Sequence, residues 1–234
     1  HARHQRGPVL DRSRRNEHPL TRSMKLSIAM IGVAALVLFG FLVFTRGGNE
    51  PSSEAASTGS NAELLVREDS PRLAEGGEAV FVEFLDFECE ACLALYPVIE
   101  DLREEYGDRV TFVVRHMPLH GNSVNAALAA EAAAEQGQFE GMYHRLFEAA
   151  EEWGHQETSQ RETFFGYADD LGLDMDRFAA AYDDPATMER IEQSQQDGQA
   201  LGVSGTPTFF LDGELLQPQS ITDLEEAFDA ALHN

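Results

Sequence analysis

A strand pattern that changes abruptly to a helical pattern is the feature that most constrains the fold of this chain. Residues 79–85, AVFVEFL, are rich in β-branched and aromatic side chains, which predicts a buried strand. From Cys89 onward the apolar residues recur at helical spacing, and Gly107 is suited to end that helix. A second strand is predicted over 110–114, VTFVV. The three segments predict a β-α-β unit with Cys89 and Cys92 at its strand-to-helix turn.

The rest of the chain extends this unit into an α/β core with a helical insertion. A first short strand is predicted in LLVRE, residues 64–68. The sequence is helical in pattern from 123 to about 201, and after it TPTFFLDGELL predicts a hairpin with an Asp-Gly turn. An amphipathic helix, ITDLEEAFDAAL, closes the chain. This order of elements predicts a thioredoxin-type fold with a helical insertion at about 122–201.

Both cysteines of the chain lie in the segment FECEAC. A bond between Cys89 and Cys92 would close too short a loop to add much stability, so a chemical role is favoured over a structural one. The unpaired N–H groups and the dipole of a helix N-terminus favour a thiolate at Cys89. Cys92 lies one turn further, within reach of a mixed disulfide formed at Cys89. This spacing is typical of dithiol–disulfide exchange.

Glu83 interrupts the apolar strand 79–85 between Val82 and Phe84. We expect its carboxyl group to be buried beneath the helix start, where it could accept the proton of Cys92. Burial raises the pKa of a carboxyl group, which suits that role. The alternative is an edge strand in which Glu83 faces water.

A second motif, GVSGTPTFF, places Pro207 directly before a predicted strand. A proline in this position is a candidate for a cis peptide bond, and it carries no N–H. The backbone of Thr206 would then be free to pair with an extended peptide. The alternative is an ordinary trans proline at a strand start.

Residues 26–45 form an uncharged apolar segment, LSIAMIGVAALVLFGFLVFT. A helix of about 20 residues spans a bilayer core of about 30 Å. We therefore expect one transmembrane signal anchor, and we prefer it to a buried helix or a cleaved signal peptide. A basic segment (1–25) precedes it, Met24 is a candidate start that would leave 1–23 upstream, and a polar, flexible linker (46–62) follows. The folded domain is expected over 63–234, on the extracytoplasmic side of the cell membrane.

Charged residues are distributed unevenly along the chain. Residues 1–46 carry seven Arg and one Lys against Asp11 and Glu17, a net charge of +6, and the remainder carries a net charge of −30. So acidic a body disfavours nucleic acid, and we expect no nucleic-acid partner.

Together these motifs resemble the DsbA-like branch of the thioredoxin superfamily. FLDFECEAC resembles its strand and active-site turn, RHMPLH its R-x-x-P-L segment, and SGTPTFFLDG its cis-proline loop. Glu83 and Pro97 match the buried acid and the helix proline of that branch. The likeness covers about 63–234, including the helical block.

This resemblance implies an extracytoplasmic thiol–disulfide oxidoreductase that acts on reduced or misoxidised exported proteins and needs no cofactor. It makes Cys89 the nucleophile and Cys92 the resolving thiol. Glu83 would handle the proton, and Thr206 and Pro207 would contact substrate. A membrane redox partner of the DsbB or vitamin K epoxide reductase type would recycle an oxidase.

One departure from the branch concerns the two residues between the cysteines. Its strongly oxidising members carry His before the second cysteine, whereas this chain has Glu90 and Ala91. With Glu88, the acid Glu90 should weaken the oxidant. We expect a reduction potential between about −120 mV (DsbA) and about −270 mV (thioredoxin), away from the DsbA end.

Other functions remain open at this point. A reductase or isomerase would differ mainly in redox poise, and a binding module would hold clients without exchange. His116 and His120 with the two cysteines imitate a zinc-finger string, but the spacing is too long for a structural site. The acids at 169–176 lack the glycine and final Glu of a calcium loop, and Asp174 is better explained as a helix cap. We therefore expect no metal site.

Overall fold

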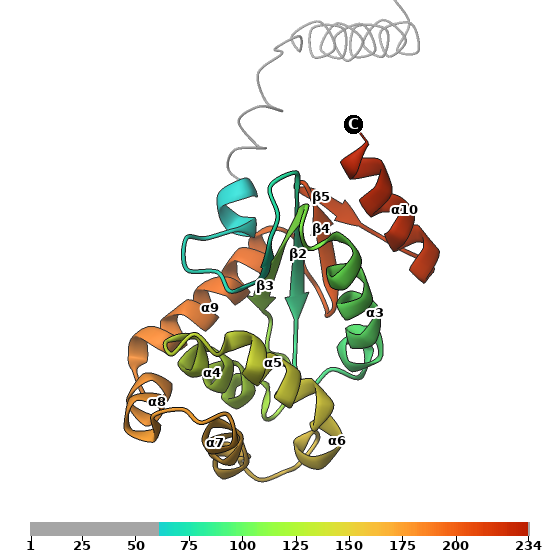
Figure 1. Ribbon diagram of the computed structural model, residues 1–234. Coiled ribbons are helices and arrows are strands. Elements are labelled where there is room, and N and C mark those ends of the chain that lie inside the picture. Colours follow the sequence, from blue (N-terminus) through green and yellow to red (C-terminus); the bar gives the residue numbers. More distant parts are fainter. Residues whose placement is uncertain (1–60, 234) are drawn as a thin grey trace, which may run out of the picture. The chain divides into compact units, whose positions relative to one another are not determined.

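Strand β2 is the centre of a mixed sheet in the computed structural model, which describes residues 61–233. Within these residues five strands pair in the order β1-β3-β2-β4-β5 (Figure 1). Their bounds are β1 (Arg72–Glu75), β2 (Ala79–Leu85), β3 (Val110–His116), β4 (Thr208–Leu211) and β5 (Glu214–Leu216). β2 and β3 run parallel, while β1, β4 and β5 are antiparallel to their neighbours. Because β2 is paired on both edges, its side chains can only leave through the two faces of the sheet.

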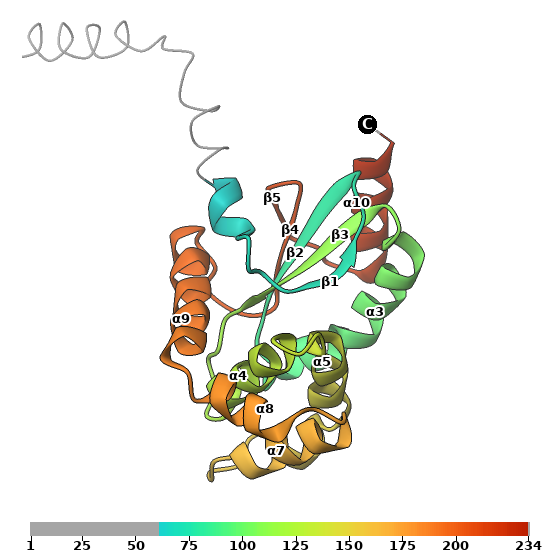
Figure 2. The ribbon, with the colours of Figure 1, turned by 60° about the vertical axis from the view of Figure 1, so that its left-hand side comes forward.

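Alternate side chains of β2 enter two separate hydrophobic clusters. Phe81 lies in the larger cluster, against Phe228 of helix α10 (Ile221–Leu232) at 5.0 Å between ring centroids. Val82 and Phe84 lie in the smaller cluster, on the opposite face. Helices α3 and α10 cover the first face and α9 the second (Figures 1 and 2). The period-two pattern of a strand buried on both sides therefore fixes the layers of the fold.

Helix α3 (Glu90–Tyr106) follows β2 after a short turn, as the sequence predicted. It ends at Gly107, whose N–H donates to the carbonyl oxygen of Arg103 at 2.9 Å. Pro97 lies inside this helix, which continues through it. The turn before α3 contains Cys89, so this connection positions the candidate site.

The predicted helical block between β3 and β4 is confirmed. Its helices are α4 (Ser123–Ala134), α5 (Phe139–Glu148), α6 (Ala150–Trp153), α7 (Arg161–Asp170), α8 (Met175–Tyr182) and α9 (Pro185–Ala200). Asp174 caps α8, as expected, by accepting a hydrogen bond from the Arg177 N–H. Helices α4 to α8 gather beyond the carboxyl ends of β2 and β3, the end of the sheet that carries Cys89 (Figures 1 and 2).

The predicted Asp-Gly hairpin is also present. Asp212 and Gly213 both have positive φ values, 49° and 89°, the combination that a two-residue hairpin turn requires. The Asp212 carboxylate also accepts a hydrogen bond from the Val80 N–H at 2.8 Å. This contact fastens the hairpin to the start of β2.

The expected first strand in LLVRE is wrong. Residues 61–65 are helical, and the first strand begins later, at Arg72. The carbonyl oxygens of Leu64 and Leu65 accept hydrogen bonds from the Arg115 guanidinium at 2.7 and 2.9 Å. A buried arginine thus satisfies backbone groups that the prediction had assigned to a neighbouring strand.

The predicted basic segment (1–25), apolar span (26–45) and nearly all of the linker (46–62) lie outside the described residues. Among the helices that the structure does describe, none is long and apolar enough to cross a bilayer.

Candidate active site

The two cysteines occupy unlike positions at the start of α3. Cys89 is the N-cap residue, with extended backbone angles (φ −81°, ψ 123°), and its own N–H donates to the Asp86 carbonyl oxygen. Cys92 lies in the first helical turn. Both are free thiols, with 8% of Cys89 and 1% of Cys92 exposed. Both thiols are therefore buried, but Cys89 keeps slightly more of its surface exposed and lies at the N-terminus of α3.

The Cys89 thiol contacts the loop before β4. Its Sγ donates to the carbonyl oxygen of Thr206 at 3.3 Å. The Thr206–Pro207 peptide bond is cis, as predicted for this motif. Strand β4 carries this loop to the site because it pairs with β2, the strand that leads into Cys89. The structure thus brings together Cys89, Thr206 and Pro207, which the sequence had singled out from separate motifs.

Glu83 is buried, as expected, and the alternative of a water-facing edge position is wrong. It lies in the central strand β2, opposite Val114 of β3 and Phe209 of β4, and only 4% of it is exposed. Burial raises the pKa of its carboxyl group to about 8, and the nearby charge of Glu100 adds to this shift. A group with that pKa can both accept and donate a proton near neutral pH.

Cys92 is electrostatically coupled to Glu83. Burial raises the pKa of the Cys92 thiol far above its ordinary value, and the Glu83 charge raises it further. The thiol therefore holds its proton at neutral pH until a base removes it. The contrast between Cys89, which is 8% exposed, and the more deeply buried, protonated Cys92 matches the division between a nucleophile and a resolving thiol.

Asp86, in the turn between β2 and α3, is a buried structural acid. One carboxylate oxygen accepts the N–H of Glu88 at 2.8 Å. The other accepts the N–H of Leu119 at 2.8 Å and the Nδ1–H of His120 at 2.7 Å. It therefore ties the cysteine turn to Leu119, the last residue of the R-x-x-P-L segment, and to His120 after it, a role that the sequence did not reveal.

Glu88 performs a similar task toward the helical insertion. Its Oε2 accepts the N–H of Asn122 at 2.6 Å and the hydroxyl of Ser123 at 3.3 Å. Its Oε1 accepts the N–H of His155 at 2.7 Å. The carboxylate is 4% exposed and joins three segments of the chain. Sequence reasoning had treated Glu88 only as a charge beside the thiol, since nothing local marks its partners.

The dipeptide between the cysteines is exposed, and Glu90 has a histidine partner. The Nε2 atom of His155 lies 3.2 Å from the Glu90 carboxylate. The rings of His155 and His120 are in edge contact, with centroids 5.8 Å apart. The sequence did not associate His155 with the cysteines, because it comes from a distant loop outside any motif, and it associated His120 with them only in the zinc alternative.

Arg115, of the R-x-x-P-L segment, supports the site from the other face of the sheet. It is buried and lies 2.6 Å from Asp197 of α9, which Arg67 also contacts at 2.6 Å. Burial raises the pKa of Asp197, but hydrogen bonds from the two arginines outweigh this and the pKa is lowered. The end of β3, which leads to Leu119 and His120, is therefore held in place by paired charges.

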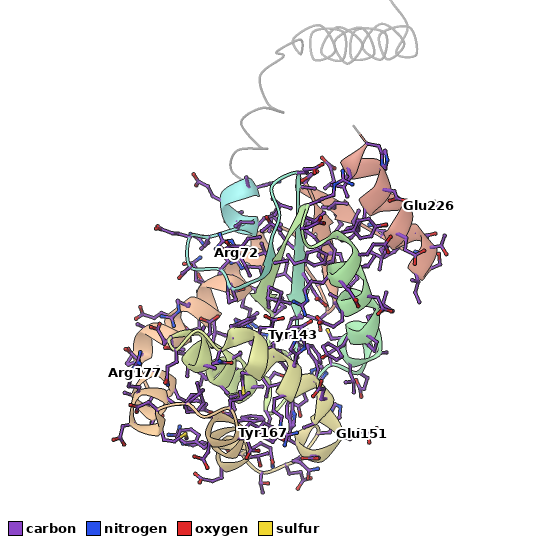
Figure 3. The ribbon with its side chains drawn as sticks, viewed as in Figure 1. Arg72, Tyr143, Glu151, Tyr167, Arg177 and Glu226 are labelled. Atoms are coloured by element: carbon purple, nitrogen blue, oxygen red, sulfur yellow. The ribbon has the colours of Figure 1, made fainter. Side chains whose placement is uncertain are left out.

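Aromatic side chains join α5 to the cysteine turn. Tyr143, labelled in Figure 3, contacts Phe87 and Tyr96 with ring centroids 6.0 and 5.7 Å apart. The Tyr96 hydroxyl bonds to the His144 ring at 2.7 Å. Nearby, Glu100 accepts a hydrogen bond from Arg103 at 2.6 Å. The Tyr96–His144 hydrogen bond therefore adds a polar contact between α3 and α5 to these aromatic ones.

The histidines of the zinc alternative have other partners. His116 Nε2 donates to Glu131 at 2.8 Å, and His120 donates to Asp86. Within residues 61–233, no three His, Cys, Asp or Glu side chains are grouped to hold a metal ion.

Comparisons with known proteins agree with this geometry. A family model described as thioredoxin matches residues 75–230. A Na⁺/H⁺ antiporter NhaA of Herminiimonas arsenicoxydans is 35% identical over 190 residues, which cover 80% of this chain and 30% of that protein. The chain therefore spans less than a third of that relative's length.

Solved structures share the fold. A thioredoxin-like oxidoreductase from Silicibacter pomeroyi is 28% identical, with a TM-score of 0.62 over 74% of this chain and 98% of that one. The thiol-disulfide exchange protein α-DsbA2 of Wolbachia pipientis is 23% identical, with a TM-score of 0.62 over 76% of this chain and 99% of that one.

Proposed function

Because this chain belongs to the thioredoxin family, we propose that it is a thiol–disulfide oxidoreductase that introduces disulfides into exported proteins. The observation that carries the proposal is the pair of unlike cysteines at the start of α3. Cys89 occupies the N-cap position of α3 with its sulfur 3.3 Å from the Thr206 carbonyl oxygen, and Cys92 is buried one turn behind it. This arrangement separates the thiol that meets a client from the thiol that resolves the complex.

The exchange begins from the Cys89–Cys92 disulfide. A client thiolate attacks Cys89 Sγ, forming a client–Cys89 bond and breaking the Cys89–Cys92 bond, so that Cys92 leaves as a thiolate. Cys92 then takes a proton, for which Glu83 is the coupled acid. A second client thiolate attacks the client sulfur of the mixed disulfide and releases Cys89 as a thiolate. The client gains one disulfide and this protein gains the two electrons as a dithiol.

Glu83 is suited to the proton step because its pKa of about 8 leaves about a tenth of it ionised at pH 7. It can therefore donate to the leaving Cys92 thiolate. In the reverse direction its ionised form accepts the proton of the Cys92 thiol. The low exposure of both groups keeps this proton from bulk water.

The backbone of Thr206 is the proposed contact for the client chain. Pro207 contributes no N–H, and Cys89 Sγ lies against the Thr206 carbonyl. An extended peptide bound beside this loop would bring its cysteine to Cys89. Together Thr206 and Pro207 form the substrate-contacting part of the proposal.

The proposed function also includes a membrane location for the domain and an oxidising direction for the exchange. An apolar segment at 26–45 supports a single-pass membrane anchor with the catalytic domain on the extracytoplasmic side. A membrane oxidase of the DsbB or vitamin K epoxide reductase type would then restore the disulfide. An antiporter activity does not follow from the NhaA relative, because this chain spans only 30% of its length.

The test is the exchange equilibrium of the full chain with reduced and oxidised glutathione, with Cys89→Ser as the control. A potential above roughly −200 mV, more oxidising than a glutathione-buffered secretory compartment, is the result expected for a disulfide donor. A potential near about −270 mV would instead assign a reductase. Absence of exchange in the parent protein would contradict both and favour a client-binding module.

A further inference from the structure

Two histidines cover the first turn of α3, although the C-x-x-C dipeptide contains none. His155 comes from the loop after α6 and its Nε2 lies 3.2 Å from the Glu90 carboxylate. His120 comes from the loop after β3 and makes edge contact with the His155 ring, with centroids 5.8 Å apart. Both loops therefore present imidazole groups beside the turn that carries Cys89.

His155 is held in position by its backbone rather than by its ring. Its φ is +56°, a left-handed conformation that few side chains other than Asn, Asp and His adopt readily. Its N–H donates to the buried Glu88 carboxylate at 2.7 Å. Because Glu88 immediately precedes Cys89, the same acid fixes both the cysteine turn and the histidine loop.

The three acids near the two rings, Asp86, Glu88 and Glu90, differ in their hydrogen-bond partners. Asp86 is buried and accepts His120 Nδ1–H together with two backbone N–H groups. Glu88 is buried and accepts two backbone N–H groups and the Ser123 hydroxyl. Glu90 is the exposed acid of the group, with 77% of its side chain accessible, and its ion-pair contact in the described residues is with His155. Among the three acids, Glu90 is therefore the one whose charge is not already satisfied by backbone N–H groups, and it is the acid that His155 contacts.

We propose that His155 supplies the cation that the C-x-x-C dipeptide lacks, offsetting Glu90 and stabilising the Cys89 thiolate when its imidazole is protonated. This inference rests on the proposed exchange chemistry at Cys89. His155 would act on Cys89 only through its charge, without taking part in the exchange. It belongs to the helical insertion and not to the C-x-x-C motif.

The direction of the effect follows from simple electrostatics. A histidine ordinarily changes charge between about pH 5 and pH 8. In the lower part of that range the cation favours the thiolate, and so favours the reduced protein and makes its disulfide a stronger oxidant. In the upper part the neutral ring no longer offsets Glu90. His120 adds less, because its Nδ1–H is directed to Asp86.

The test measures the pH profile of Cys89 alkylation by iodoacetamide in the reduced full-length protein. The variant is His155→Asn, since asparagine tolerates the left-handed backbone and keeps the N–H to Glu88 while its side chain is neutral and short. We expect its alkylation rate to fall about two- to fivefold at about pH 6, the range for an exposed ion pair. At about pH 9, above the range in which a histidine ordinarily carries charge, the rates should agree.

Two further variants complete the design. His155→Lys carries a permanent charge on a backbone that lysine adopts less readily than asparagine, so a rate at about pH 6 that returns toward the parent value reports the charge and not the loop. His233→Asn, a substitution of an exposed histidine near the end of α10, should follow the parent at every pH. A distorted loop would lower the rate of His155→Asn at both pH values and His155→Lys would not restore it, and that pattern overturns the inference.

The outcomes separate this inference from the proposed function. If the parent reacts at Cys89 and His155→Asn matches it across the profile, the charge role of His155 is refuted and the exchange function stands. If the parent reacts no faster than its Cys89→Ser variant, the proposed function and this inference both fail.

Discussion

The Cys89 sulfur lies 3.3 Å from the carbonyl oxygen of Thr206, across 117 residues of sequence. The contact is possible because β2 and β4 are antiparallel neighbours, with Phe84 opposite Thr208. The pairing of these two strands therefore assembles the site, since it places the loop before β4 against the turn after β2. The rest of the site consists of groups that hold this turn or respond to its charge.

Glu83→Gln should change the pH dependence of stability. The folded-state pKa of Glu83 is about 8 against an ordinary value of 4.5, so between these values the folded state holds a proton that the unfolded state has lost. Stability therefore falls as the pH rises through this window, and a neutral glutamine removes that loss. The variant's free energy of unfolding relative to the parent should rise by on the order of 3 kcal/mol between about pH 5 and pH 8.

Urea unfolding of both reduced proteins at these pH values measures the difference. Because any cost of burying the glutamine amide is the same at each pH, the slope and not the absolute stability is decisive. Parallel pH profiles of stability would show that the pKa of the Glu83 carboxyl is not raised in the folded state.

Glu88→Gln should destabilise the fold although the side chain keeps its shape. The carboxylate accepts the N–H groups of Asn122 and His155 on its two oxygens, and a glutamine must present an NH₂ group to one of them. Leaving one buried donor without an acceptor costs about 1–3 kcal/mol. The matched substitution Glu90→Gln, at an exposed site two residues away, should stay within about 0.5 kcal/mol of the parent. Equal urea midpoints for the two variants would show that the hydrogen bonds of the Glu88 carboxylate do not stabilise the fold.

Arg115→Lys should destabilise more than the same exchange on the surface. The guanidinium donates to Ser194, Asp197 and the carbonyl oxygens of Leu64 and Leu65. A lysine cannot make this set, and the loss within a buried ion pair should cost about 2–3 kcal/mol. Arg109→Lys is the control, because Arg109 pairs with Glu78 where both side chains are exposed, and it should cost less than about 1 kcal/mol. Thermal unfolding that ranks the two variants the other way would contradict the assignment.

The main strands and helices were predictable because the type and spacing of apolar residues follow which side chains a strand or helix buries. The run of β-branched and aromatic residues in 79–85 and the helical repeat after Cys89 predicted β2 and α3. The cis Pro207 and the burial of Glu83 were also predictable, since a proline before a strand and an acid between apolar residues are local signals. The short strand at Arg72–Glu75 was not, because it is half exposed and its pattern is weak.

The surroundings of the cysteines were predicted less well, because their partners are distant in sequence. Glu88 was interpreted only as a negative charge and Asp86 was given no role, yet both are buried acceptors for backbone N–H groups. The approach of His155 to Glu90 depends on how the helical insertion folds back, and no local pattern records it.

The difference between the two cysteines is tested most directly by trapping a mixed disulfide. The variants Cys92→Ala and Cys89→Ala each leave one thiol, 8% exposed at Cys89 and 1% exposed at Cys92 in the parent structure. Each is mixed with oxidised glutathione near neutral pH, and the glutathione adduct is followed by mass spectrometry of the intact protein. We predict a rapid adduct on Cys89 in the first variant and almost none on Cys92 in the second, since its thiol is buried and its pKa is raised. Equal reaction of both thiols, or faster reaction of Cys92, would contradict the central claim that Cys89 is the nucleophile of an exchange site.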